Sequence, residues 1–324
     1  MKLKKLMNDF LQDYVKQNKI EFSEWSINVN NQEGFGDYSS NIALKLAKIL
    51  KKSPIDIAKD ITNHPNVSGN IFTLSASKPG FVNFHISNDY YLKILKQIIN
   101  ESENFGKKKK LNKSANVEFV SSNPTGPLTV GHGRQAILGD MVSNILTWNG
   151  YDVTREYYYN DAGKQMRVLA ESCYAKYAKQ VGKDFEMPEN GYVGTYLDEI
   201  AEKIVNEHGK DLESDNPIFR DFTEKEIFAN IENTLKNLGI KFDVFTKEGT
   251  FYKNGAIDNV LKILKEKNLS YEKDGAVWFK TSSLNKEEDK VLVKSSGEPT
   301  YRLPDIAYHA DKVDRGFDLI VDIF

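Results

Sequence analysis

The sequence has a single cysteine and no long apolar run, and each shortage excludes a class of protein. Cys173 alone cannot form an internal disulfide, which is compatible with a reducing cytoplasm. No metal-ligand cluster lies near it, and we predict no metal-binding residue. No apolar run approaches the roughly 20 residues that a membrane-spanning helix needs. The start of the chain, MKLKKLMNDFLQDYV, is amphipathic and contains acidic residues, unlike a signal peptide. The sequence therefore predicts a cytoplasmic protein without a membrane segment.

The sequence also lacks a large net charge, because 44 Lys and Arg nearly balance 46 Asp and Glu. The balance is uneven along the chain. Residues 1–113 carry 18 basic and 11 acidic side chains, a net charge of +7, and the remainder carries −9. This asymmetry is typical of a small domain that meets a polyanion beside a large domain that binds a cation. The alternative is that the lysines only solvate helix faces. The run Lys107–Lys110 is interpreted as a solvated linker and a domain boundary.

The length of 324 residues suits about two domains, at roughly 150 residues each. Apolar residues at helical spacing predict helices near residues 3–14 and 42–50, and alternation over 82–86 predicts a strand. A small α+β unit therefore occupies the first part of the chain. The segment from about 163 to 241 is predominantly helical in pattern, and further strands and a helix are predicted between residues 242 and 280.

The segment from Val117 to Asp161 is built like a nucleotide-phosphate site. An apolar, β-rich run ends in the turn NPTGP, and a helix opens at Val130-Gly131-His132. The first N–H groups of a helix have no partner within it and bind anions, and glycine allows a ligand to approach the backbone. His132, in that first turn, can donate to a phosphate. The alternative is a plain Gly-His turn after a strand.

The string NPTGPLTVGHGR resembles the HIGH signature of class I aminoacyl-tRNA synthetases. The flanking EFVSSN and YYYNDAGKQ are similar to arginyl-tRNA synthetases in particular, and the resemblance covers essentially the whole chain. It implies that Asn123, Thr129, Gly131 and His132 bind ATP, and that Thr129 and His132 act in catalysis together with Mg²⁺. Thr129 stands where the signature has its first histidine. A hydroxyl can hydrogen-bond a phosphate or ribose oxygen, but it cannot carry the positive charge of an imidazole.

The resemblance also implies a site for the arginine side chain. The segment TYRLPDIAYHADKVDRGFDLIVDIF resembles the part of the arginyl enzyme that returns to the active site. It places Tyr301 and Asp305 four residues apart, which is one face of a helix. With Glu118, they are implied to hold the guanidinium. The alternatives are that Asp305 only interacts with the helix dipole and that Glu118 is an exposed residue of an edge strand.

Two further residues are implied to bind the amino-acid backbone. Asn123 matches the family position that binds the α-amino group, and its alternative role is to form the Asn-Pro turn. Gln165 belongs with Asp161 to a polar pair near the backbone of the bound amino acid. Helix capping by Asn160 or Asp161 is the alternative for that pair.

The fold implied by the resemblance is α/β. A small α+β N-terminal additional domain, residues 1–110, contacts tRNA. A Rossmann-type catalytic domain follows over residues 114–324, with a helical and mixed insertion at about 165–290. No KMSKS-like string is found in the sequence. We therefore expect an N-terminal fragment that lacks the KMSKS loop and the anticodon-binding domain and cannot aminoacylate alone.

The activity implied is that of an arginine-tRNA ligase, a monomer whose partners are L-arginine, ATP and arginine tRNA. Arginine attacks the α-phosphorus of ATP to form arginyl-adenylate, and the arginyl group is then transferred to the 3′ end of the tRNA. Positioning and charge stabilisation carry both steps. Two alternatives remain open: a non-catalytic tRNA-binding relative, and a small-molecule nucleotidyltransferase with an HxGH-type loop.

Overall fold

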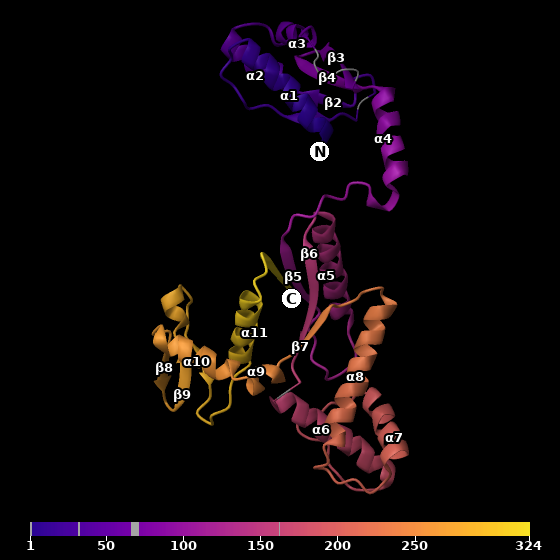
Figure 1. Ribbon diagram of the computed structural model, residues 1–324, viewed down its shortest axis with the longest axis vertical. Coiled ribbons are helices and arrows are strands. Elements are labelled where there is room, and N and C mark those ends of the chain that lie inside the picture. The colour runs from indigo at the N-terminus through magenta and orange to yellow at the C-terminus, as the bar shows by residue number, and fades with distance from the viewer. Residues whose placement is uncertain (1, 32, 66–70, 162) are drawn as a thin grey trace. The chain divides into compact units, whose positions relative to one another are not determined.

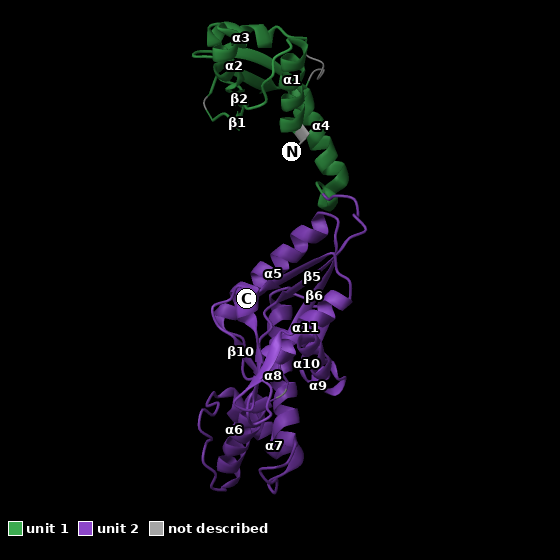
Figure 2. Ribbon diagram, turned by 90° about the vertical axis from the view of Figure 1, so that its left-hand side faces the viewer, with its two compact units in different colours: residues 1–106 green, residues 107–324 purple. Residues whose placement is uncertain are grey.

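The computed structural model describes residues 2–31, 33–65, 71–161 and 163–324. The chain divides into two compact units, Met1–Gly106 and Lys107–Phe324 (Figures 1 and 2). No helix among the described residues is long and apolar enough to cross a membrane.

Unit 1 is an antiparallel sheet packed against helices. Its sheet has the order β1-β2-β4-β3. Its elements are α1 (Lys2–Gln17), β1 (Ile27–Val29), β2 (Tyr38–Ser40), α2 (Ile42–Leu50), α3 (Pro54–Thr62), β3 (Phe72–Ser77), β4 (Phe81–Ile86), α4 (Asn88–Glu101) and η2 (Ser102–Asn104). Phe10, Phe72 and Phe84 meet edge to face in its core, an arrangement that aromatic rings prefer. The helices predicted near 3–14 and 42–50 and the strand over 82–86 are all present.

Unit 2 is built on a four-stranded parallel sheet of order β11-β5-β6-β7, which confirms the predicted α/β class. Its elements are β5 (Ser114–Phe119), α5 (Val130–Trp148), β6 (Asp152–Tyr159), α6 (Gly163–Val181), α7 (Tyr196–His208), α8 (Ile218–Asn237), β7 (Val244–Lys247), α9 (Gly249–Lys253), α10 (Ala256–Glu266), β8 (Ser270–Lys273), β9 (Ala276–Phe279), η3 (Thr281–Leu284), β10 (Lys290–Val293), α11 (Arg302–Asp314) and β11 (Leu319–Ile323). The strand order reverses between β5 and β11. Ligands of open parallel sheets bind at the carboxyl ends of the strands at such a reversal.

Strand β5 directs alternate residues to opposite faces of this sheet, as a strand must. Phe119 packs on α5 at Gly139, where a Cβ atom would lie only 2.0 Å from the ring. Glu118 instead contacts Lys312 of α11. Helices α5 and α11 therefore cover opposite faces (Figure 2), and Gly139 allows the close approach of α5 because it has no side chain.

Two long intervals separate the strands of the parallel sheet after β6. The sequence predicted one insertion at about 165–290, and β7, which lies within that range, pairs with β6. Helices α6, α7 and α8 fill the first interval. The second interval, between β7 and β11, contains α9, α10, the small antiparallel sheet β10-β9-β8 and α11 (Figure 1). We therefore propose two inserted segments.

Candidate active site

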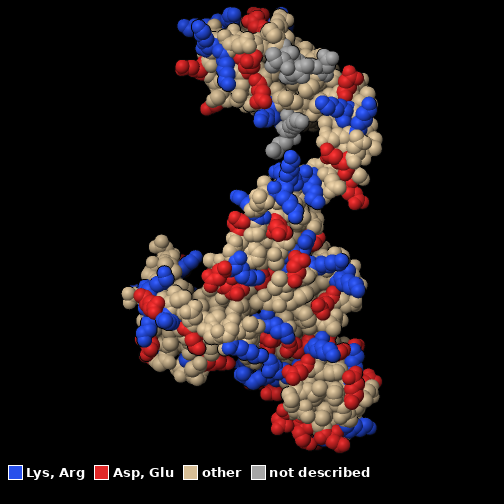
Figure 3. Space-filling view, in the orientation of Figure 1, with Lys and Arg blue, Asp and Glu red and all other residues tan. Residues whose placement is uncertain are grey.

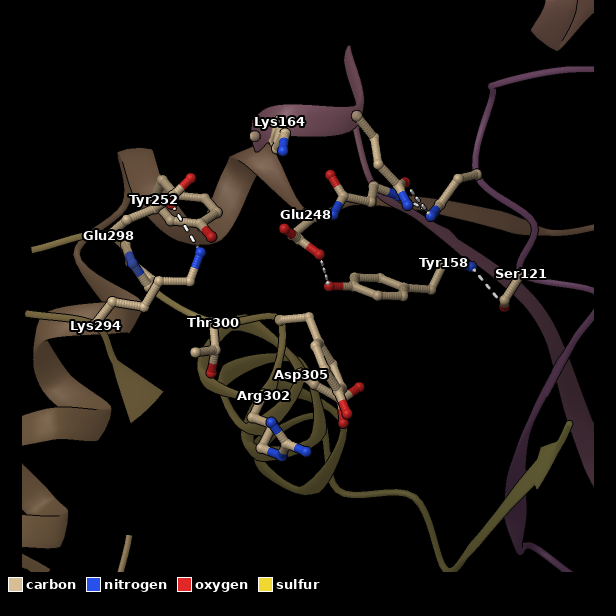
Figure 4. Close-up of a pocket in the computed structure, with 16 residues that line it drawn as sticks. Ser121, Tyr158, Lys164, Glu248, Tyr252, Lys294, Glu298, Thr300, Arg302 and Asp305 are labelled. Atoms are coloured by element: carbon tan, nitrogen blue, oxygen red, sulfur yellow. Dashed lines mark hydrogen bonds and ion pairs between the residues drawn. The ribbon is translucent and has the colours of Figure 1, made fainter. Parts of the chain in front are cut away.

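A cavity of about 640 Å³ opens where the parallel strands end (Figure 4). Ser121 and Asn123 follow β5, Asn160 follows β6, and Glu248 follows β7. The remaining lining residues come from the end of β6, from the start of α6, from α9, from the segment after β10 and from the start of α11: Tyr158, Gly163, Lys164, Gln165, Tyr252, Lys294, Glu298, Pro299, Thr300, Tyr301, Arg302 and Asp305. The cavity thus has the position expected of a ligand site in an open parallel sheet.

Asn123 connects the carboxyl ends of β5 and β6 in the lining of this cavity. Its Nδ2 donates to Gln165 Oε1 at 2.8 Å, and its Oδ1 accepts from the Asn160 N–H at 3.2 Å. The structure therefore brings together the two residues predicted to bind an amino-acid backbone. Asp161 binds the start of α9, because its Oδ1 accepts from the Gly249 N–H at 2.7 Å.

Glu248 is the main site residue that the sequence did not indicate. It is 5% exposed, and its Oε2 accepts from the Tyr158 hydroxyl at 2.9 Å (Figure 4). Burial raises the pKa of Glu248 to about 7, and the nearby carboxylates of Asp161 and Asp305 act in the same direction. A carboxylate that is costly to ionise in the empty cavity will gain from a cationic ligand. The only sequence signal was its place directly after a strand.

Tyr301 and Asp305 lie at the amino end of α11. Tyr301 is the N-cap residue rather than a helical residue, and the Asp305 N–H donates to its carbonyl oxygen at 3.3 Å. Both line the cavity, and Asp305 also lies in the first helical turn, where a carboxylate is favoured. The Arg302 guanidinium sits 4.6 Å from the centre of the Tyr301 ring. The face of Tyr301 can therefore accept a guanidinium.

Glu118 is not among the residues that line the cavity. It is 2% exposed on the second strand of the sheet, and its carboxylate accepts from Lys312 Nζ and, at 2.7 Å, from the Ser121 hydroxyl. It is therefore not on an edge strand. These contacts engage both carboxylate oxygens of Glu118 and connect β5 to α11. Direct binding of arginine by Glu118 stays a prediction.

A buried ionic network fixes α11 on the sheet. The Lys312 ammonium is fully buried between Glu118 of β5 and Asp322 of β11. One turn on, Arg315 Nη2 donates to both oxygens of the buried Glu156 of β6, at 3.0 and 2.9 Å. Three strands thus hold one helix. The network binds the carboxyl end of α11, the helix whose amino end brings Tyr301 and Asp305 to the cavity.

His309 extends this network toward solvent. Its hydrogen bond to Asp322, 3.2 Å long, raises the pKa of His309 to about 9, so that the ring is cationic at neutral pH. Burial opposes ionisation of Asp322, but the bonds from His309 and Lys312 hold its pKa at about 2. His309 and Asp322 therefore form a charged pair at physiological pH.

The predicted phosphate site begins α5, outside the lining of the cavity. Thr129 and His132 form a capping box, in which the Thr129 N–H donates to His132 Nδ1 at 3.1 Å. A ring nitrogen that accepts carries no proton, so the neutral ring holds its proton on Nε2. That N–H remains available to a ligand. The helix predicted to open at Val130 begins at that residue, and a Cβ on Gly131 would have only Thr129 Oγ1 nearby, at 3.6 Å.

Charges of both signs face this cavity. Glu248 and Asp305 supply negative charge, while Lys164, Lys294 and Arg302 supply positive charge (Figure 4). The hydrogen bond and ion pair with Lys294 lower the pKa of Glu298 and engage both groups. A ligand with a cationic side chain and a carboxylate matches this arrangement.

Comparison with known families agrees with the motifs. A model for the class I tRNA synthetases (R), catalytic domain, matches residues 94–322, and a model for the arginyl tRNA synthetase N-terminal domain matches residues 1–86. The resemblance predicted from the HIGH-like signature is confirmed by these matches.

Individual proteins give the same result. Proteins named arginine–tRNA ligase from Desulfotalea psychrophila and Chlorobium luteolum are each 46% identical, over 93% and 90% of this chain and 55% and 54% of theirs. A Campylobacter jejuni crystal structure, described as that of an arginyl tRNA synthetase, matches with a TM-score of 0.69 at 31% identity, over 74% of this chain and 54% of that one. The chain spans about half the length of the curated relatives it matches. On these matches and on the parallel sheet with its HIGH-like helix, the chain belongs to the family of class I tRNA synthetases (R).

Proposed function

We propose that this chain carries the amino-acid-activating site of an arginine–tRNA ligase. The proposed reaction is the ATP-dependent activation of L-arginine to arginyl-adenylate, followed by transfer to the 3′ end of arginine tRNA. The observation that carries the proposal is the cavity at the ends of β5, β6 and β7, which has the carboxylates of Glu248 and Asp305 and the ammonium of Lys164 in its lining. No residue of the proposed site needs to act as a covalent nucleophile.

The shape and charge of a guanidinium suit this cavity. It offers five N–H donors in a rigid plane, and carboxylates pair with it through charge-assisted hydrogen bonds. Asp305 and Glu248 would accept these bonds, and the Tyr301 ring would contact the guanidinium, as it contacts that of Arg302. Asn123 and Gln165 would hold the amino-acid backbone. Glu118 enters the proposal as a positioning residue, because it binds the helix that carries Asp305.

ATP is proposed to bind at the start of α5. The helix N-terminus, Thr129, Gly131 and the Nε2 proton of His132 offer donors to the phosphates. Asn123 would lie between ATP and arginine. Among the described residues no group of three His, Cys, Asp or Glu could hold a metal ion. Any Mg²⁺ that takes part is proposed to bind through the ATP phosphates.

The remaining parts of the proposal concern the tRNA, the oligomeric state and the localisation. Arginine tRNA would be the second substrate, with the N-terminal domain as one of its contacts, and we propose a cytoplasmic monomer. The matched family domains favour this function over both a non-catalytic relative and a small-molecule nucleotidyltransferase.

The proposal predicts selective binding of L-arginine that depends on Asp305. We expect Asp305→Asn to weaken L-arginine binding by roughly 10- to 100-fold, the loss of one charge-assisted interaction of about 1.5–3 kcal/mol. Calorimetric titration of the chain with L-arginine, L-lysine and L-citrulline measures this. Asp314→Asn, at the other end of α11, is the matched control and should bind as the unaltered chain does. Equal affinity for the three amino acids, or an unchanged affinity in Asp305→Asn, would refute the proposal.

A second prediction concerns pH. Because burial raises the pKa of Glu248 to about 7, the carboxyl is largely neutral at pH 6 and ionised at pH 8. L-arginine should therefore bind more weakly, by up to about tenfold for each pH unit below 7, and its affinity should reach a plateau above pH 7. Asp161 and Asp305 also face Glu248. The facing hydroxyls of Tyr158 and Tyr252 should not titrate in this range, because burial raises the pKa of both.

The controls for this prediction use the same substitution at two sites. Glu248→Gln should bind weakly with no pH dependence between 6 and 8. Glu298→Gln should keep the dependence, because the hydrogen bond from Lys294 lowers the pKa of Glu298 and keeps it ionised throughout. A pH dependence that survives in Glu248→Gln would assign the titration to another group.

A further inference from the structure

The lysine run between the two units is not a free linker in this structure. The Lys108 N–H donates to the Trp148 carbonyl at 2.9 Å, and the Leu111 N–H donates to the Gly150 carbonyl at 2.8 Å. The Lys113 carbonyl accepts from the Asp152 N–H, also at 2.8 Å. The backbone of residues 107–113 is therefore bound to the end of α5 and to the start of β6. Gly150 permits the contact, since a Cβ there would lie 2.3 Å from the Lys109 carbonyl oxygen.

The lysine side chains on this bound backbone point to solvent. We call Lys107, Lys108, Lys109, Lys110 and Lys113 the lysine ridge; all five are exposed, and blue atoms crowd where it crosses the end of unit 2 in Figure 3. Within the described part of the chain, none of the five has an ion-pair partner. Five ammonium groups on a short fixed backbone repel one another, and an external anion would relieve that cost.

The residues around the ridge help to identify the kind of anion that the ridge would bind. A hollow of about 350 Å³ lies beside it, lined by Lys110, Lys113 and Gly150 but also by Asp152 and Asp318. Asp318 is engaged, because its Oδ2 accepts from the Ser114 N–H at 2.8 Å. The ridge thus keeps an excess of positive charge over these two acids.

An aromatic ring borders the same surface. Trp148 is 40% exposed, and Lys107 Nζ lies 5.8 Å from its ring centre. Unpaired lysines next to an exposed indole are a combination that suits nucleic acid, with its phosphates and stacking bases.

The position of the ridge argues for a polymer rather than a single nucleotide. The ridge lies at the amino end of β5, whereas the cavity lies beyond its carboxyl end. Six residues of strand span about 20 Å. A ligand that uses both sites must be at least that long.

We propose that the lysine ridge binds the sugar-phosphate backbone of RNA, namely the tRNA that the proposed function requires. The backbone of the ridge is already fixed, so binding does not cost the conformational entropy that a flexible tail would lose. Neutralised phosphates release counterions, so each lysine contact should contribute about 0.7–0.9 to the slope of log affinity against log salt.

The test is tRNA binding by the whole chain at several salt concentrations. Fluorescence anisotropy with an arginine tRNA transcript is measured from 50 to 300 mM KCl. The ridge variant combines Lys107→Gln, Lys108→Gln, Lys109→Gln and Lys110→Gln. The matched control combines four exposed lysines from elsewhere in unit 2: Lys225→Gln, Lys241→Gln, Lys267→Gln and Lys286→Gln. A third variant replaces the ridge lysines by arginine.

We expect the ridge variant to bind about 10- to 100-fold more weakly near 0.1 M salt, with a slope shallower by about 2–4. The control and the arginine variant should stay within about threefold of the unaltered chain. No tRNA binding by the unaltered chain, an unchanged slope in the ridge variant, or an equal loss in the control would overturn the proposal. L-arginine titration of the same proteins tests the activating site separately, because the ridge is remote from the cavity.

Discussion

Replacing Lys312 by methionine is expected to destabilise the fold by about 3–5 kcal/mol. The Lys312 ammonium is fully buried and accepted by Glu118 and Asp322. Methionine fills a similar volume but leaves both carboxylates near one another without the cation. Removing one partner of a buried ion pair costs far more stability than removing one partner of an exposed pair, because the remaining buried charge stays desolvated. The free energy of unfolding from urea titration measures the effect.

The control is the same substitution at an exposed ion pair of the same unit. Lys203 pairs with Glu226 at 2.5 Å with about half of its side chain exposed, and Lys203→Met should cost under about 1 kcal/mol. Adding Glu118→Gln and Asp322→Asn to Lys312→Met should recover much of the loss, because the unpaired charges are removed. A loss below about 1 kcal/mol for Lys312→Met alone would contradict the role given to this network.

The network also shows where sequence reasoning stops. Val117 to Gly131 could be predicted as strand, loop and helix because the signals are local: β-rich residues, a Pro-Gly turn and a helix start. The contact of Glu118 with Lys312 could not be predicted, because 194 residues separate the two in the sequence. Neither periodicity nor spacing relates residues 118 and 312, and only the packing of α11 on β5 brings them together.

The lining of the cavity likewise contains residues that the sequence indicated and one that it did not. Asn123, Gln165, Tyr301 and Asp305 were predicted from strings that resemble a family, and all four line one cavity. Glu248 was missed, because a single glutamate after a short strand has no distinguishing pattern. Its raised pKa comes from burial by residues distant in the chain, a property of the folded state alone.

Replacing His132 by alanine is expected to slow arginyl-adenylate formation by about 10²–10³-fold, the usual effect of removing one preorganised donor from a developing charge. In the structure His132 Nδ1 accepts from the Thr129 N–H, which leaves the Nε2 proton for a phosphate oxygen. The rate is measured in single turnovers with the native gene product, ATP and saturating arginine. Arg134→Ala, two residues along the same helix and exposed, is the matched control and should change the rate by less than about threefold.

Because His132 also belongs to the capping box, this experiment distinguishes a role in helix stability from a role in catalysis. His132→Ala also removes an acceptor from the start of α5, which should cost about 0.5–2 kcal/mol of stability, so the rates are compared at a temperature where both proteins are fully folded. A loss of stability with an unchanged rate would mean that His132 serves α5 as a cap and does not reach the phosphates. A large loss of rate with intact folding would place ATP at the start of α5. It would also show that threonine, which caps the same helix, is sufficient where the family signature has its first histidine.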